Sequence, residues 1–160
     1  MVSCVFPGSF DPVTKGHMDL ISRAASLFDH VTVAVMINLR KSGTIPAEKR
    51  IEMLCRACSA YPNVSVEKWD GLLADYMSLK KERIVIRGIR SSAELDQELQ
   101  ACSANSLLNG SIETVFLPCS PLMSGISSSA VREIAAFGGD ISAFVPEDMT
   151  EEIKSLLSKE

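Results

Sequence analysis

The chain has 160 residues, a length typical of one domain with a sizeable core. Hydrophobic residues make up 46% of it and charged residues 22%, which is ordinary for a soluble globular protein. The net charge of -4 argues against a general nucleic-acid-binding protein, which would carry a basic excess.

Neither a membrane anchor nor a secretion signal is expected. No apolar run approaches the roughly 18 to 20 residues that span a bilayer. The N-terminal stretch MVSCVFPGSF lacks a basic segment followed by a long apolar core, so it does not have the pattern of a signal peptide. The five cysteines are scattered and odd in number, which favours a reducing cytoplasm.

Short apolar runs alternate with longer amphipathic stretches along the chain. Runs rich in Val and Ile predict strands at 2–6, 31–37, 64–67, 83–86 and 113–117. Helical spacing of apolar residues predicts helices at 16–28, 47–61, 72–80, 93–108, 127–137 and 146–158. This alternation predicts one α/β domain over residues 1–160, with a single doubly wound parallel sheet of about five strands and helices on both faces. Ligands of such sheets bind beyond the carboxyl ends of the strands.

The segment after the first predicted strand, VFPGSFDPVTKGHMDLISRA, is the first with unusual chemistry. We expect Pro7 and Gly8 to turn the chain. Gly16 and His17 then fall in the first turn of a helix, where unpaired N–H groups and the helix dipole favour a phosphate. An imidazole at that position can donate a hydrogen bond to a phosphate oxygen. A histidine that merely caps or packs the helix is the alternative.

The stretch GSFDPVTKGH resembles the nucleotidylyltransferase signature G-x-F-x-P-x-T/H-x-G-H, and its Thr14 form resembles the phosphopantetheine adenylyltransferase branch. The matching residues are Gly8, Phe10, Pro12, Gly16 and His17. The resemblance implies a Rossmann-like nucleotidylyltransferase fold. It also implies that Ser9, Phe10 and His17 bind ATP, that Ser9 contacts the acceptor as well, and that His17 is catalytic.

A second segment with candidate site residues, RGIR at 87–90, follows the fourth predicted strand. Two guanidinium groups at the end of a strand offer forked donors to phosphate oxygens. Ser91 or Ser92 can cap the following helix, with Glu94 in its first turn. The segment resembles the RG-L/I-R motif of phosphopantetheine adenylyltransferases, which implies that Arg87 binds the acceptor phosphate. In that motif the ATP site includes Gly88, Ile89, Arg90 and Glu98, with Arg90 also catalytic.

The third segment, MSGISSS at 123–129, offers more N–H and O–H donors than a helix cap requires. It resembles the I-S-S/T-S motif of the same family. The resemblance implies ATP contacts from Met123, Ser124, Gly125, Ile126, Ser127, Ser128 and Ser129. Many members carry a bulkier run where Met123, Ser124 and Gly125 stand, so the packing on the adenine side differs here.

Two further residues complete the expected site. Lys41 aligns with the family lysine that contacts phosphate near the reaction centre, which makes it a catalytic and substrate-binding candidate. Leu73 lies where the family has a substrate-contacting residue, although an ordinary core leucine is the alternative.

The resemblance covers essentially the whole chain and implies adenylyl transfer from ATP to 4'-phosphopantetheine, giving 3'-dephospho-coenzyme A and pyrophosphate in coenzyme A biosynthesis. Alignment and charge stabilisation would suffice for this reaction, without a covalent intermediate. Mg²⁺ on the ATP oxygens is the expected cofactor, since no carboxylate cage is evident. A cytoplasmic homohexamer with feedback by coenzyme A is also implied.

Other functions remain open on the sequence. A sister enzyme acting on nicotinamide mononucleotide, or a cytidylyltransferase acting on an alcohol phosphate, would share the first motif. A nucleotide-binding regulatory module would leave His17 and the paired arginines unexplained. A redox or zinc site at Cys55-x-x-Cys58 is disfavoured, because the pair is expected on the apolar face of a helix without a second pair. His30 is expected to cap a helix end.

Overall fold

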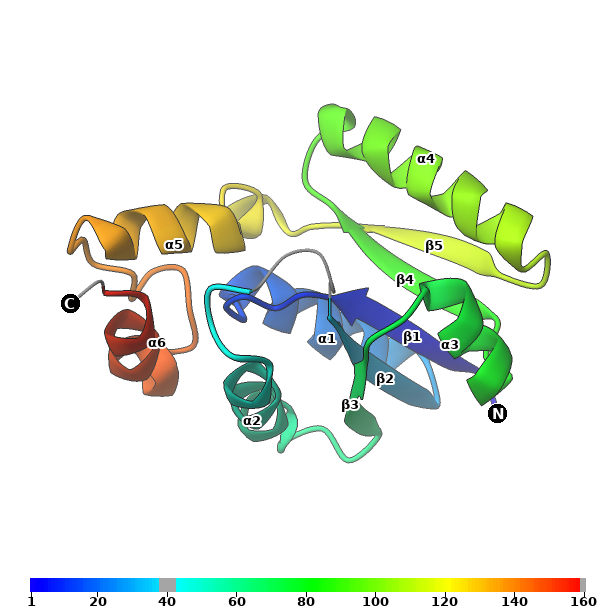
Figure 1. Cartoon of the computed structure of the whole chain (residues 1–160), viewed down its shortest axis with the longest axis horizontal. Coiled ribbons are helices and arrows are strands. Elements are labelled where there is room, and N and C mark those ends of the chain that lie inside the picture. Colours follow the sequence, from blue (N-terminus) through cyan, green and yellow to red (C-terminus); the bar gives the residue numbers. More distant parts are fainter. Residues whose placement is uncertain (38–42, 159–160) are drawn as a thin grey trace.

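A computed structural model describes residues 1–37 and 43–158 of the chain. Its centre is one sheet of five parallel strands in the order β3-β2-β1-β4-β5 (Figure 1). The strands are β1 (Ser3–Gly8), β2 (His30–Met36), β3 (Val64–Trp69), β4 (Ile84–Ile89) and β5 (Glu113–Pro118). The predicted parallel, doubly wound α/β fold is confirmed.

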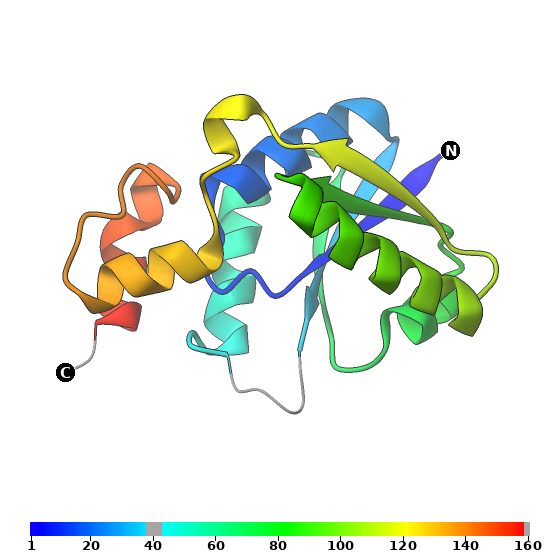
Figure 2. The ribbon, with the colours of Figure 1, turned by 90° about the horizontal axis from the view of Figure 1, so that it is seen from above.

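Helices cover both faces of the sheet. The α-helices are α1 (Lys15–Leu27), α2 (Ala47–Cys58), α3 (Leu73–Lys80), α4 (Ser92–Leu108), α5 (Ser128–Ala136) and α6 (Thr150–Leu157), and the short 3-10 turns are η1 (Pro121–Met123) and η2 (Glu147–Met149). Helices α1 and α2 lie on one face, and α3 and α4 lie on the other. Helices α5 and α6 extend beyond one end of the sheet (Figure 2).

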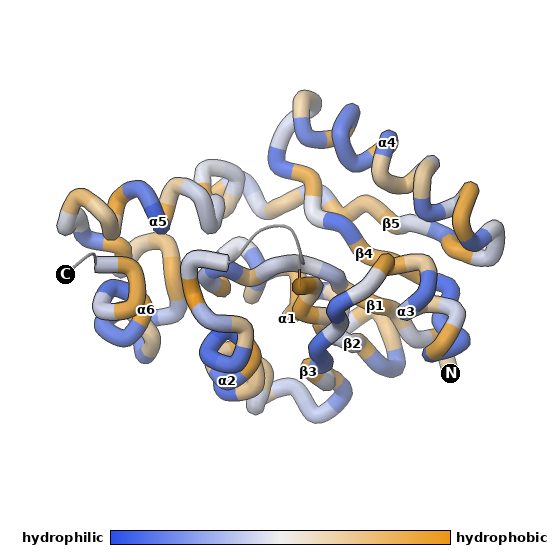
Figure 3. The backbone as a smooth tube through the Cα atoms, viewed as in Figure 1, coloured by the Kyte–Doolittle hydropathy of each residue, from blue (hydrophilic) through white to orange (hydrophobic). Residues whose placement is uncertain are grey.

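The alternating directions of strand side chains divide the core into two parts. Cys4, Phe6 and Val33 point to one face and pack with residues of α1 and α2, whereas Val5 and Val85 point to the other and pack with residues of α3. Figure 3 shows hydrophobic residues along the central strands. Along α2 and α4, hydrophobic residues alternate with hydrophilic ones. Across the described part of the chain, no helix combines the length and apolarity that crossing a bilayer requires.

The strand order reverses between β1 and β4, which are neighbours in the sheet although two other strands, β2 and β3, lie between them in sequence. Beside this switch point, loops from adjacent strands lead away in opposite directions and leave a crevice for ligands. The segments that leave β1 and β4 here are the two that the sequence singled out first.

Several local predictions were wrong in placement. Pro7 and Gly8 do not turn the chain but pair with Ala34 and Val35 in the sheet, so the turn begins at Ser9. His30 does not cap a helix: it starts β2, and its Nε2 lies 3.0 Å from the Ser65 hydroxyl.

The expected apolar placement of the Cys55-x-x-Cys58 pair holds for only one member. Cys58 is buried but Cys55 is exposed, because the two positions lie 3 residues apart and straddle the edge of the apolar face. All five cysteines are free thiols.

Candidate active site

The start of α1 is closed by a reciprocal pair of hydrogen bonds between Thr14 and His17. The backbone N–H of His17 donates to Thr14 Oγ1 at 3.3 Å, and the backbone N–H of Thr14 donates to His17 Nδ1 at 3.0 Å. In the usual capping box a Glu or Gln occupies the histidine's position. Here an imidazole does so, and one of its nitrogens is thereby committed to the helix cap.

The cap sets the tautomer of His17, and the surroundings of the ring set its charge. Because Nδ1 accepts a hydrogen bond from an amide, the single proton of the neutral ring belongs on Nε2. Burial, reinforced by the positive charges of Arg90 and Arg87, lowers the pKa of His17 from its ordinary value to about 4. At neutral pH the ring is therefore uncharged and presents Nε2–H as its donor.

Phe10 supports the imidazole from within the turn. Its ring is almost fully buried and meets the His17 ring edge-to-face, with 4.9 Å between ring centroids. The backbone of Phe10 has a φ of 48°, in the left-handed region, and the following Asp11–Pro12 bond is cis. Gly8 leaves space for this arrangement, because a Cβ there would lie 3.0 Å from the Phe10 ring.

Two polar side chains brace the turn against the chain that leads into α2. Asp11 accepts hydrogen bonds from the backbone N–H groups of Thr44 and Ile45, both at 2.8 Å. The buried Arg50 donates to the backbone carbonyl of Ser9 at 2.7 Å and to that of Ile45 at 2.9 Å. The turn is therefore held from outside as well as by its own cap.

The first arginine of β4 is held by α4 and by the end of β1. Arg87 Nε and Nη2 donate to the two oxygens of Glu98 at 2.7 and 2.6 Å, and Nη1 donates to the Pro7 carbonyl at 2.8 Å. The forked pair orients the guanidinium. Arg87 and Glu98, predicted to bind different substrates, therefore contact each other.

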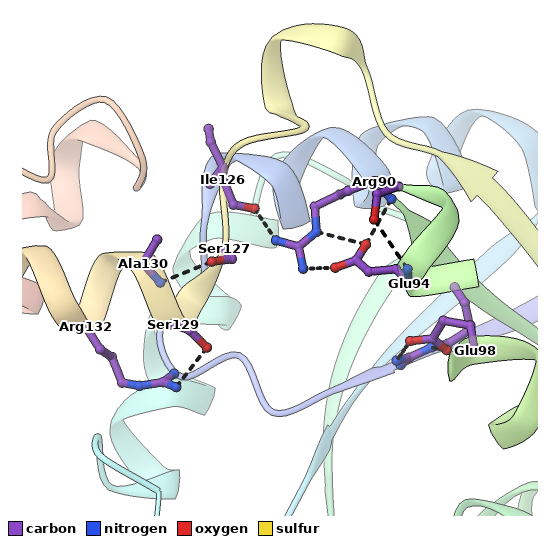
Figure 4. Close-up of polar contacts among 10 residues, drawn as sticks. Arg90, Glu94, Glu98, Ile126, Ser127, Ser129, Ala130 and Arg132 are labelled. Atoms are coloured by element: carbon purple, nitrogen blue, oxygen red, sulfur yellow. Dashed lines mark hydrogen bonds and ion pairs between the residues drawn. The ribbon is translucent and has the colours of Figure 1, made fainter. Parts of the chain in front are cut away.

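Arg90, the first residue after β4, joins α4 to the serine segment. Its backbone N–H, Nε and Nη2 all donate to the carboxylate of Glu94, and its Nη1 donates to the Ile126 carbonyl at 2.8 Å (Figure 4). Burial alone would raise the pKa of Glu94, but the hydrogen bonds and charge of Arg90 outweigh it and lower the pKa of this carboxyl.

The serine segment packs back on the turn. Ser127 caps α5 by accepting from the Ala130 N–H at 3.1 Å, and the Ser128 hydroxyl donates to the Pro12 carbonyl at 2.7 Å. Arg132 donates to the Ser129 hydroxyl at 3.2 Å and to the Asp11 carbonyl. Figure 4 shows Arg132 and Ser129 on α5, across from the Arg90–Glu94 pair.

These elements enclose a cavity of about 320 Å³, which we call the His17 cavity. Among its lining residues are most of those predicted to bind ATP: Ser9, Phe10, His17, Gly88, Arg90, Glu98, Ile126, Ser127, Ser128 and Ser129, together with Arg87. Imidazole, guanidinium and hydroxyl donors from three separate segments thus converge on one space that is suited to a chain of phosphates.

A second cavity of about 710 Å³, the Leu73 cavity, adjoins the first. It lies between α3 and α4 and is lined mainly by apolar groups, with Leu73, Cys102 and Asn105 among them. The two cavities share Pro7, Gly8, Ser9, Arg87 and Glu98. An elongated ligand in the Leu73 cavity would therefore present its end to Arg87 and to the contents of the His17 cavity.

Not every predicted residue lies at the cavities. Four described residues expected to bind ATP fall outside the lining of the His17 cavity: Ile89, Met123, Ser124 and Gly125. Lys41 lies outside the described residues, so its predicted role stays a prediction.

Arg132 and Glu94 line the His17 cavity although neither was predicted as a site residue. The sequence could have predicted Arg132 as a site residue, because it lies one helical turn after Ser128 and therefore on the same side of the helix. The sequence could not have predicted Glu94 as a site residue, because an acidic residue in the first turn of a helix is fully explained by capping.

Comparison with known proteins agrees with this geometry. The sequence model of the cytidylyltransferase-like family matches residues 5–134. A Clostridium perfringens protein named phosphopantetheine adenylyltransferase is 44% identical over 154 residues, covering 96% of this chain and 94% of that protein. A Streptomyces coelicolor protein of the same name is 43% identical over 159 residues, covering 97% of this chain and 99% of that protein.

A solved structure supports the fold alone. It is that of a Vibrio parahaemolyticus protein assigned as a nicotinate-nucleotide adenylyltransferase, which aligns with a TM-score of 0.65 at 15% identity and covers 98% of this chain and 92% of its own. The alignments with the two sequence relatives cover nearly the full length of both proteins in each pair, and the two relatives have the same name. The chain therefore belongs to the cytidylyltransferase-like family and, within it, to the phosphopantetheine adenylyltransferases.

Proposed function

We propose that the protein transfers the adenylyl group of ATP to 4'-phosphopantetheine, forming 3'-dephospho-coenzyme A and pyrophosphate in coenzyme A biosynthesis. The observation that carries this proposal is the junction of two cavities at Arg87. The His17 cavity is lined by donors for phosphate, and the Leu73 cavity is larger and mainly apolar. ATP suits the first cavity, and the pantetheine arm suits the second. The names of the Clostridium and Streptomyces relatives support the same pair of substrates.

In the proposed reaction, an oxygen of the acceptor phosphate forms a bond to the α-phosphorus, and the bond from that phosphorus to the bridging oxygen of the β-phosphate breaks. The pyrophosphate leaves with the bonding electron pair. The acceptor phosphate is already an anionic nucleophile at neutral pH, so no side chain has to remove a proton or form a covalent bond. The task of the protein is alignment and stabilisation of charge.

The chain's residues would divide this task by position. Nε2–H of the neutral His17 ring donates to an α-phosphate oxygen, on which charge builds in the transition state. Arg87 holds the acceptor phosphate. Arg90 and the hydroxyls of Ser128 and Ser129 hold the departing pyrophosphate, and Lys41 remains a candidate for the charge near the α-phosphorus.

We propose Mg²⁺ as the cofactor, bound through the ATP oxygens. The acidic groups that line the His17 cavity, Glu94 and Glu98, are each paired with an arginine. Among the described residues there is no group of three or more His, Cys, Asp or Glu side chains arranged for a metal ion. Bound in this way, the ion would neutralise the charge of the triphosphate.

Three further expectations stay proposals. For the proposed homohexamer, exposed leucines on α4 support association between copies, and the number of six subunits comes from the family resemblance. Inhibition by coenzyme A is supported by the two adjoining cavities, since this molecule carries both a pantetheine arm and an adenine nucleotide. A cytoplasmic location is supported by the five free cysteines, which suit a reducing compartment.

The test is pyrophosphate release with ATP, Mg²⁺ and 4'-phosphopantetheine, with dephospho-coenzyme A identified by mass. We expect turnover with this pair, and none with nicotinamide mononucleotide as the acceptor or with CTP as the nucleotide. His17→Ala should lower kcat by about 10²- to 10³-fold, the usual cost of one transition-state donor. His30→Ala is the matched control, because His30 contacts Ser65 and is not among the lining residues of either cavity. Pyrophosphate release with another acceptor only would overturn the proposal.

A further inference from the structure

Helix α4 presents two carboxylates to the end of β4. Glu94 and Glu98 are 4 residues apart, one turn of helix, and each is paired with one of the two arginines that flank Gly88 and Ile89. The helix has no fully buried residue, so its contact with the sheet relies on such polar groups more than on core packing. Glu98 was expected at the ATP site from the family resemblance, but Glu94 was expected only to support the helix start.

The side chain of Glu94 does not serve as a helix cap. In a capping box the acidic residue at the third helical position reaches back to the backbone N–H of the cap residue, which here is Ser91. Glu94 instead accepts from the backbone N–H of Arg90 at 3.0 Å and from the Arg90 guanidinium. Ser91 already caps the helix by accepting from the Glu94 N–H at 3.3 Å. The carboxylate is therefore committed to Arg90.

This commitment sets the orientation of the guanidinium plane. A guanidinium has five N–H groups. In Arg90, Nε and Nη2 use one each on Glu94, and Nη1 uses one on the Ile126 carbonyl. Two N–H groups, one on Nη1 and one on Nη2, remain for a ligand in the His17 cavity, which Arg90 lines. Figure 4 shows the guanidinium held between Glu94 and Ile126, at the side of the cavity opposite Arg132.

We infer that Glu94 is a positioning residue for the triphosphate: it holds Arg90 so that the two free N–H groups meet the phosphates that leave. This inference rests on the proposed function and names the residue through which the Arg90 contact is organised. A free arginine side chain loses rotamer entropy when a ligand immobilises it, and the contact with Glu94 removes much of that cost before ATP binds.

The sign of the effect separates positioning from simple electrostatics. If Glu94 acted only through its charge, removing a carboxylate beside a triphosphate would tighten ATP binding. If it positions Arg90, neutralising it weakens binding and slows turnover. Hydrogen bonds to charged groups contribute about 1.5 to 3 kcal/mol, so we expect Glu94→Gln to raise the Kd for ATP and to lower kcat/KM for ATP by about tenfold or more. The KM for the acceptor substrate should change by less than about twofold, since Arg87 keeps its own partner.

The experiment compares five variants with the wild type. Four are the single variants Glu94→Gln, Glu94→Asp, Asp96→Asn and Arg90→Ala, and the fifth is the double variant Glu94→Gln/Arg90→Ala. Asp96→Asn removes the same charge from an exposed position of the same helix and should leave both the Kd and kcat unchanged. Glu94→Asp keeps the charge and should recover part of the loss. In the Arg90→Ala protein, Glu94 is an unpaired carboxylate facing phosphate, so Glu94→Gln should leave ATP binding unchanged or tighten it.

Three results would overturn the inference: tighter ATP binding in Glu94→Gln alone, a loss no larger than that of Asp96→Asn, or an equal further loss in the Arg90→Ala background. The last of these results, together with a lower melting temperature of the Glu94→Gln protein, would indicate that Glu94 has a structural role only. Measuring the Kd for ATP requires no turnover. If the wild type released no pyrophosphate the proposed function would fail, while the binding data would still decide the role of Glu94.

Discussion

At the scale of single residues, the donors of this site are defined by the hydrogen bonds they already make. His17 commits Nδ1 to the Thr14 amide, and Arg87 and Arg90 each commit three of their N–H groups to fixed acceptors. What remains free is one N–H on the imidazole and two on each guanidinium. Such partial commitment orients a donor before the ligand arrives, which is the condition for effective stabilisation of a transition state.

The protonation of His17 gives a direct prediction. With a pKa lowered to about 4, mainly by burial, the imidazole of the free protein should stay neutral from about pH 8 to about pH 5, where an ordinary histidine gains its proton. A ¹⁵N–¹H NMR titration should show Nε2 protonated and Nδ1 unprotonated over this range. The His17→Asn variant assigns the resonances. A midpoint near pH 6.5 for His17 would contradict the prediction.

The same shift affects stability, and its sign follows from linkage. The unfolded chain binds the proton near pH 6.5, whereas the folded chain binds it only near pH 4, so acid favours the unfolded state. The stability that His17 contributes is present above about pH 6.5 and is lost as the pH falls towards about 4. Chemical denaturation of His17→Asn should therefore show a shallower loss of stability over that window than the wild type.

At the scale of elements, the close approach of α1 to β4 depends on the absence of a side chain at Gly88. A Cβ at this position would lie 2.3 Å from Leu20 Cδ1, and Leu20 is buried in the core. This contact sets the distance between the helix that carries His17 and the strand that carries Arg87. The glycine of the RGIR segment therefore has a packing role in addition to any contact with ATP.

Replacing Gly88 by Ala should destabilise the fold by about 1 to 3 kcal/mol through overpacking. The measurement is urea denaturation. Gly110→Ala is the control, because a Cβ there would come no closer than 3.9 Å to a neighbouring atom, and we expect a change within about 0.5 kcal/mol. In a Leu20→Ala background the added methyl group has space, so Gly88→Ala should cost less. An equal cost in both backgrounds would show that Leu20 is not the obstacle.

At the scale of the whole molecule, this single chain leaves several large apolar side chains of α3 and α4 exposed. Leu99, Leu107 and Leu108 are 46%, 89% and 62% exposed, and Leu79 on α3 is 64% exposed. Several large apolar side chains on neighbouring helices are typical of an interface rather than of a free surface. Their exposure supports association with other copies of the chain, whereas the proposed number of six subunits comes from the family resemblance alone.

The assembly can be tested by light scattering after size-exclusion chromatography. The wild type should have the mass of a hexamer, and the Leu107→Glu/Leu108→Glu variant should have a smaller mass, because charges at a buried interface are costly. Leu27→Glu, on α1 at the other face of the sheet, removes a leucine about as exposed as Leu108 and serves as the control. A monomeric wild type would refute the proposed hexamer, and an unchanged variant would exclude this face as an interface.

Much of the architecture could be read from the sequence alone. The five strands and the helices fell near their predicted positions, because the period of apolar residues and the runs of Val and Ile are local properties of the chain. The parallel sheet followed from their alternation. The positions of His17, Arg87, Arg90 and the serines between predicted strands and helices made them candidates, and their roles in the site came from the resemblance of their motifs to the family.

Only the tertiary structure decided what each of these groups contacts. The pairing of Glu94 with Arg90, the link from Arg132 to Ser129 and Asp11, and the brace of Arg50 on the Ser9 carbonyl join elements that are distant in the chain or explained locally by other roles. The type of a residue and the pattern around it determine whether it lies in a strand, a helix or a loop, because secondary structure depends strongly on near neighbours in the chain. Which donor remains free for a ligand depends on acceptors brought in by folding, and a linear pattern does not contain them.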